Sequence, residues 1–311
     1  MRHSLEVARW ELVQNLRNRQ FILLTVLLPI IIIGVMTLAA LIGTSSPHQA
    51  GGSASLQRLV QGLQSANQDQ VQTIVPMALG LSFAFVFIFV AIFSGQLVLQ
   101  NVVREKQSRV VELLLSSISP RELMAGKILG FGALGMVQAL LWVAIGLLLL
   151  LFIGPYLGLP VLPLLAVLLA NMPWGMFALY LLYFVIGYLF IASLSAALGA
   201  TMTDYLSGQQ FQQVIITLPS MIPFFIVSLL LQEPNGTVAR VFSYIPFTTA
   251  GTMMMRLAVG PISPWEILAS LLVLLLSSWL AIRVAGKVFE ISILLYGKSV
   301  SLREIWRWAR G

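Results

Sequence analysis

Long apolar runs separated by short polar segments dominate this chain. An α-helix of about 20 apolar residues spans a hydrocarbon core of roughly 30 Å, and each long run reaches that length. We therefore expect six transmembrane helices, at 21–43, 74–100, 127–153, 174–200, 209–231 and 265–285. The pattern predicts an all-α integral membrane protein that forms a single transmembrane domain over residues 1–311.

Prolines and broken apolar stretches modify this simple picture. Pro173 precedes the fourth run, so a short outer helix is expected at 162–171. Pro219 and Pro223 lie one turn apart in the fifth run and predict a kink whose freed carbonyls need internal partners. The stretch 232–264 is too long for a turn and too broken for a span, so we expect short re-entrant or outer-surface helices there.

The two ends of the chain are basic and amphipathic. Segment 1–20 is expected to form a helix that lies at the membrane interface, and the alternative is a plain basic flank that orients the first span. The apolar positions that recur there at helical spacing are Leu5, Ala8, Leu12 and Leu16. Segment 286–311, with Trp306 and Trp308 among arginines, is expected to form a cytoplasmic helix.

The charge distribution indicates the topology. Charged residues make up 9% of the chain, against about 25% in soluble proteins, so the chain could not cover a water-facing surface. Fifteen of the 18 Lys and Arg residues fall in the N-terminal segment, in 101–127 or from 283 onward. The other three are Arg58, Arg240 and Arg256. The positive-inside rule then places both termini in the cytoplasm, and we expect a prokaryotic cell-membrane protein.

Residues that carry chemistry are scarce. The chain has no cysteine and two histidines, and no metal-ligand spacing is present. Gly297–Ser299 resembles the end of a phosphate-binding loop, but that pattern needs a glycine at 292, where the chain has Ser292. The spans hold almost no ionisable residue, and we expect no buried carboxylate that would mark an ion path. The sequence thus predicts no catalytic, cofactor-binding or metal site.

Amides and small residues are the other features inside the spans. Gly126 and Gly130 form a GxxxG pattern that favours close helix packing of some kind. Amide side chains are candidates for the lining of a translocation pathway, although such groups also bond across helices. These candidates are Gln96, Gln100, Gln138, Gln212 and Gln213.

The polar segment 101–126 carries a mixed-charge stretch followed by an apolar block. A helix of this kind at the cytoplasmic surface suits docking into a groove on a soluble partner, and the alternative is an interfacial helix that lies on lipid. The residues expected to contact the partner are Arg104, Glu105, Lys106, Arg109, Glu112, Leu113, Leu114, Ser119 and Pro120.

Segment Glu105–Ser117, followed by Ser119–Pro120 and Gly126–Gly130, closely resembles the coupling-helix segment of ABC type-2 permeases. The particular resemblance is to the branch of sodium-efflux permease subunits. Further similar stretches follow in the same order along the chain: Gly199–Thr201 with Asp204, Tyr244–Thr248, Arg256 with Gly260, and Leu295–Lys298.

The resemblance implies a six-span permease subunit that forms a dimeric pathway, most simply as a homodimer, and exports its substrate. It also implies two copies of a separate soluble subunit that binds ATP and Mg²⁺ and contacts 101–126. Members of that branch commonly carry a large outer domain between the first two spans, where this chain has only 44–73. The substrate therefore stays open between a lipid or hydrophobic compound, a peptide and Na⁺.

Two other functions remain possible from the residues alone. One is a membrane scaffold or receptor that is coupled to an ATPase without moving a substrate. The other is a carrier that works without ATP, which would be active as the purified chain.

Overall fold

A computed structural model describes residues 2–19, 21–23, 25–31, 68–107, 119–157, 161–172 and 174–294. These residues are helical almost throughout, and none of them forms a β-strand. Four of the described helices are long and apolar enough to cross a membrane: α4 (Gln68–Gln107), α6 (Pro120–Ile153), α8 (Trp174–Thr201) and α15 (Pro264–Leu294). The prediction of an all-α integral membrane protein is confirmed.

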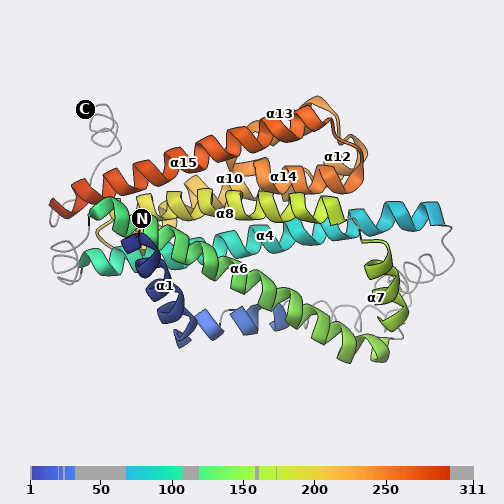
Figure 1. Ribbon diagram of the computed structural model, residues 1–311, viewed down its shortest axis with the longest axis horizontal. Helices are drawn as coiled ribbons and strands as arrows, with labels where there is room; N and C mark the ends of the chain where they lie inside the picture. Colours follow the sequence, from blue (N-terminus) through green and yellow to red (C-terminus); the bar gives the residue numbers. More distant parts are fainter. Residues whose placement is uncertain are drawn as a thin grey trace.

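Helices α4, α8 and α15 lie side by side along the long axis of the molecule, and α6 runs obliquely to them (Figure 1). Helix α1 (Arg2–Leu16) crosses α6 near one end of the bundle. The 3₁₀ turn η1 (Gly154–Leu157) and helix α7 (Val161–Ala170) lie at the opposite end, where the sequence predicts a short outer helix. Of the first predicted span, 21–43, the described part is helical over Phe21–Ile31.

The fifth predicted span, 209–231, is a chain of short helical pieces in place of one helix. Its pieces are α9 (Tyr205–Gln212), the π-helix η2 (Gln213–Thr217), α10 (Leu218–Ser220), α11 (Ile222–Phe225) and α12 (Val227–Gln232). Pro219 and Pro223 stand at the starts of α10 and α11, where a missing N–H group is tolerated. The two prolines thus divide the helix more thoroughly than the single expected kink.

Segment 232–264 contains a helical hairpin whose second helix is buried. Helix α13 (Thr237–Tyr244) and helix α14 (Pro246–Val259) meet at Ile245 and lie in the half of the bundle away from α1 (Figure 1). Helix α14 packs against α4, α8 and α15 and is buried along most of its length. Gly187 of α8 permits this approach, because a Cβ there would stand 2.6 Å from Ala250 Cβ.

Hydroxyl groups and small residues join the long helices, as expected where lipid supplies no hydrophobic force between helices. Tyr183 Oη of α8 lies 2.6 Å from Ser270 Oγ of α15 and donates to Ile267 O at 3.2 Å. Ser278 Oγ of α15 donates to Ile186 O at 3.1 Å. Leu and other large apolar side chains are exposed along α6 and α15, as befits a surface that faces lipid.

Replacing Tyr183 by Phe should lower the free energy of unfolding by about 0.5–1.5 kcal/mol, the range of interhelical hydrogen bonds in membranes. The change removes one hydroxyl and leaves the buried Ser270 without that partner. Unfolding in mixed detergent micelles measures the effect. Tyr156→Phe is the matched control, because Tyr156 is 91% exposed, and it should change nothing. An equal loss in both variants would contradict the assignment.

Candidate functional site

Five polar residues form a cluster at the α1 end of the bundle, which we call the Lys127 cluster: Glu11, Asn15, Asn101, Glu105 and Lys127. Lys127 Nζ of α6 forms an ion pair with Glu11 of α1 and lies 2.5 Å from Glu105 Oε1 of α4. Asn15 Nδ2 donates to Glu11 Oε2 at 3.1 Å. One ammonium group therefore joins three helices that are far apart in sequence.

Burial makes this cluster significant. The side chains of Lys127 and Glu11 are 2% and 3% exposed. A charge removed from water costs several kcal/mol unless it is paired, so each member depends on the others. Glu11 and Glu105 lie outside the predicted spans, so this buried cluster is a feature that the sequence analysis missed. The sequence gives no local sign that Glu11 and Lys127 pair, because the two residues are 116 positions apart.

The GxxxG pattern is the contact surface for α1. A Cβ at Gly126 would stand 2.6 Å from Ser4 O, and one at Gly130 would stand 2.8 Å from Ala8 O. The two glycines thus let the backbones of α1 and α6 touch, which brings Glu11 to Lys127. The packing that the pattern favours therefore lies within one chain.

The most deeply buried side chains of α1 are polar, and Val7, Leu12 and Leu16 pack against the core as half-buried neighbours. Ser4, Glu11 and Asn15 are buried, whereas Leu5 is 65% exposed and Leu12 is half-buried. The ion pair with Lys127 and the close contacts of Ser4 and Val7 with Gly126 favour this orientation of α1. The exposed Leu5 is left on the face directed away from α6.

Five of the nine expected partner-binding residues lie on the two helical arms that flank 108–118. Lys106 Nζ of α4 donates to Ala200 O at 2.8 Å, and Gln107 Nε2 donates to Thr203 O at 2.8 Å. Lys106 thus satisfies a carbonyl in the last turn of α8, where a cation is favourable, and Gln107 bonds to the turn that follows α8. Arg104 is exposed. The arm formed by α4 is thereby attached to α8.

The other arm begins with a helix cap. Ser119 Oγ accepts a hydrogen bond from Glu122 N at 3.3 Å and donates to Glu122 Oε2 at 3.0 Å, and Pro120 occupies the first turn of α6. Helix α4 continues to Gln107 and α6 starts at Pro120, past the predicted span ends at 100 and 127. The other expected contact residues lie outside the described part of the chain: Arg109, Glu112, Leu113 and Leu114.

A second capped turn follows α8. The Asp204 carboxylate caps α9 by accepting a hydrogen bond from Ser207 N at 2.8 Å. This bond, made to the charged form, holds the pKa of Asp204 below its ordinary value. The turn contacted by Gln107 is therefore ordered by its own cap as well.

The five glutamines divide into three environments. Gln96 and Gln100 are half-buried on α4, and Gln213 is exposed in the π-helix. Gln212 and Gln138 are buried, and Gln212 Nε2 donates to Ser195 Oγ at 3.1 Å across the gap left by Gly95. The structure does not bring all five to one surface.

An aromatic face runs along α4 toward the broken fifth run. Phe85, Phe89 and Phe93 succeed one another at helical spacing and are half-buried. Phe224 of α11 contacts the first two, with ring centroids 5.5 and 6.4 Å apart. Trp142 of α6 contacts Phe89 and Phe93, each at 6.4 Å. Sequence analysis missed this face, although its spacing of four residues was visible.

A second charged group fastens the helical hairpin at the other end of the bundle. Arg256 of α14 is fully buried, and its Nη2 lies 2.7 Å from Glu266 Oε2 of α15. Its remaining nitrogens donate to Pro234 O at 2.5 Å and Ser243 Oγ at 2.7 Å. Arg240 reaches the second oxygen of Glu266 at 3.2 Å. Arg256 thus joins α13, α14 and α15 without an unpaired charge.

Among the described residues, no three His, Cys, Asp or Glu side chains lie close enough together to hold a metal ion. The ionisable groups above are paired with one another or with helix ends. These groups therefore hold helices together.

Comparison with known proteins identifies relatives of this chain. The model of the ABC-2 family transporter protein matches residues 51–287. The chain is 31% identical over 209 residues to the uncharacterized protein MJ1024 of Methanocaldococcus jannaschii, covering 67% of this chain and 48% of that protein. It is 27% identical over 225 residues to the uncharacterized protein YhaP of Bacillus subtilis, covering 69% and 51%. The chain spans about half the length of these curated relatives.

Replacing Lys127 by Met should cost about 3–5 kcal/mol of unfolding free energy, because it leaves two carboxylates buried without their cation. Combining Lys127→Met with Glu11→Gln and Glu105→Gln should recover most of that loss. Unfolding in mixed micelles measures all variants. If the losses of unfolding free energy from the three separate substitutions simply added up in the triple variant, the three groups would not act together.

Gly130→Ala should detach α1 from α6, because the new methyl group would meet the backbone of Ala8. Amide hydrogen exchange across α1 should then rise. Gly146→Ala is the matched control on the same helix, since nothing lies within 4 Å of a Cβ there. It should leave the exchange of α1 unchanged. Equal amide exchange of α1 in the two variants would contradict the close contact of α1 with α6 at Gly130.

Proposed function

The chain belongs to the ABC-2 transporter family and is a multi-pass membrane permease subunit, and from this premise we propose that it exports its substrate with energy from a separate ATP-binding subunit. The soluble subunit binds ATP and Mg²⁺, and two copies of it drive a dimer of permease chains. The chain itself has no catalytic role. The match is to the family as a whole, so the resemblance to the sodium-efflux branch stays a prediction.

The observation that supports this function most strongly is the anchoring of both arms around 108–118. Glu105 at the end of α4 and Lys127 near the start of α6 are joined to each other and to Glu11 of α1. Lys106 adds the end of α8. A force applied to the connection would therefore reach four helices as one rigid body, which is how domains transmit movement.

The orientation follows from charge. In the proposed topology the Lys127 cluster is on the cytoplasmic side, where the ATP-binding subunit is available, and the hairpin held by Arg256 is on the outer side. Basic residues in excess at the α1 end support this direction. Residues 109–114 would dock into a groove on the soluble subunit, with leucines as anchors and Glu112 and Arg109 setting the register.

The aromatic face of α4 is our candidate for the pathway. Phe85, Phe89 and Phe93 are half-buried within one chain, so a second copy could complete the lining. Phe224 of the fifth run contacts this face, and the π-helix and prolines of the same run provide local adaptability. Half-buried aromatic rings with Gln96 and Gln100 on the same helix favour a lipid or hydrophobic compound as substrate over Na⁺ or a peptide.

The double substitution Glu112→Arg with Leu114→Asp should abolish co-purification of a soluble ATP-binding subunit from the native membrane, because it removes an anchor and reverses a charge at the docking surface. Vanadate-sensitive hydrolysis should disappear with it. Glu233→Arg is the matched charge reversal at the other end of the bundle, where Glu233 is exposed, and it should retain both.

Full partner binding by the double variant would overturn the docking assignment. A wild-type chain that purifies without a partner and transports in liposomes would favour the ATP-independent carrier. Hydrolysis without a moved substrate would favour the scaffold.

A further inference from the structure

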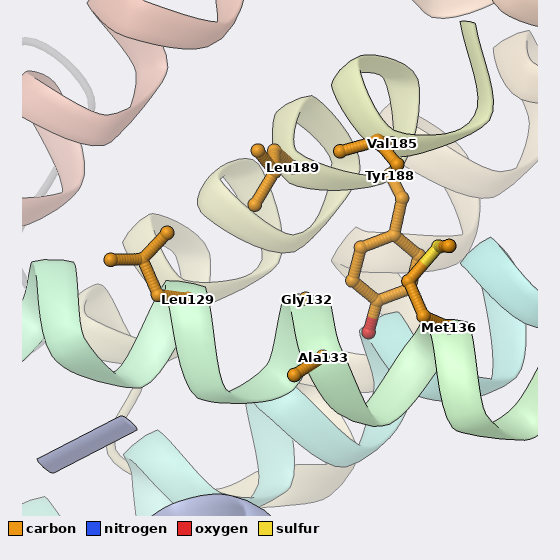
Figure 2. Close-up of a pocket in the computed structure, with 7 residues that line it drawn as sticks. All are labelled: Leu129, Gly132, Ala133, Met136, Val185, Tyr188 and Leu189. Carbon is orange, nitrogen blue, oxygen red and sulfur yellow. The ribbon is translucent and has the colours of Figure 1, made fainter. Parts of the chain in front are cut away.

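A cavity of about 170 Å³ lies between α6 and α8 (Figure 2). Every described residue that lines it comes from these two helices: Leu129, Gly132, Ala133, Met136, Val185, Tyr188 and Leu189. The hydroxyl of Tyr188 is engaged by Ser94 of α4, so the side chain contributes mainly its ring. The lining is therefore apolar.

Gly132 creates this hollow without being needed for helix contact. Gly126, Gly130 and Gly135 are each in close contact with a neighbouring helix, so that a Cβ there would collide. A Cβ at Gly132 would meet only Leu189 Cδ2, the far end of a flexible side chain, at 3.1 Å. Together with the small Ala133 beside it, Gly132 leaves open a space that a larger residue would fill.

The hollow is open at its rim. Leu129 and Ala133 are exposed, and Met136, Val185 and Leu189 are half-buried. Such a rim on spanning helices faces the lipid that surrounds them.

The position of the cavity across the bilayer can be inferred from residues of the neighbouring helix α15. Ser278 of α15 bonds to Ile186 of α8, and both helices run in the same direction, so Trp279 stands close to the level of Leu189. Arg283 follows one turn further, with its guanidinium 3.8 Å from the Trp279 ring centroid. Tryptophan and arginine in this arrangement mark the headgroup level of a bilayer. The cavity thus begins at the boundary between headgroups and acyl chains on the α1 side.

We propose that this cavity binds the part of a phospholipid acyl chain nearest the glycerol, from the leaflet on the α1 side. The volume agrees, because an engineered apolar cavity of about 150 Å³ in another protein binds benzene and stays free of water. The cavity accommodates a comparable apolar volume, here a short run of methylene groups. This inference is independent of the ATP-binding subunit.

An occupied cavity would also influence the helices that line it. The acyl chain stands between α6 and α8, and Tyr188 connects the same place to α4 through Ser94. A bound acyl chain would therefore help to hold α6 at a fixed distance from α8 and α4. Helices α4 and α6 carry Glu105 and Lys127 of the Lys127 cluster.

The test is photo-crosslinking of the full-length chain in liposomes that contain phosphatidylglycerol with a diazirine near the start of one acyl chain. Peptide mass spectrometry locates the label. In the wild-type chain, labelling should concentrate on 129–136 and 185–189. Ala133→Trp fills the cavity from its exposed rim and should reduce this labelling by about tenfold, equal to ~1.4 kcal/mol of binding free energy. Leu148→Trp, on an exposed position of the same helix, should leave it unchanged.

Even labelling along the exposed face of α6 in the wild-type chain would overturn the proposal, whatever the variants do. So would undiminished labelling in folded Ala133→Trp protein. Neither result depends on transport, so a failed lipid site and a failed exporter assignment are distinguishable.

Discussion

One buried lysine determines how the described helices are arranged. Lys127 cannot leave water without carboxylates beside it, and the two that it finds are on α1 and α4. This requirement draws α1 against the glycines of α6, places its polar face inward and fastens the end of α4 where the 108–118 connection begins. At the other end, Arg256 imposes the same kind of constraint on the hairpin and α15. Buried charge thus closes the bundle at both ends.

Between these two ends the contacts are different in kind. Hydroxyl bonds such as that of Tyr183 and the close approaches at Gly187 hold α4, α8, α14 and α15 together. Among the described residues, the fifth run departs from regular helix through its π-helix and two prolines. A bundle that is fastened at both ends and adaptable along one wall suits the proposed function, in which movement at a soluble partner would change a pathway without unfolding the chain.

The apolar pattern was sufficient to predict an all-helical membrane protein, and the motifs around Glu105–Ser117 were sufficient to predict its family. Other features depend on contacts between distant positions. Glu11 lies in a segment whose leucine spacing suggested a different face, and nothing in that spacing reveals Lys127. A polar set at positions 4, 11 and 15, opposite a GxxxG pattern, was the available signal. Arg256 belonged to the resemblance, but its role required the fold. The cavity beside Gly132 had no signal in sequence.

The most direct test of the account is a distance between spin labels within one chain, on cysteines that replace Leu5 of α1 and Leu206 of α9 in a chain that has no other cysteine. Both positions are exposed. The complex would be measured without nucleotide and with trapped ATP. The account predicts the same distance in both states, because the Lys127 cluster and Lys106 move these elements as one body. The account would be contradicted if trapping ATP changed the distance between these two labels within one chain as much as it changed the distance between equivalent positions of two permease chains.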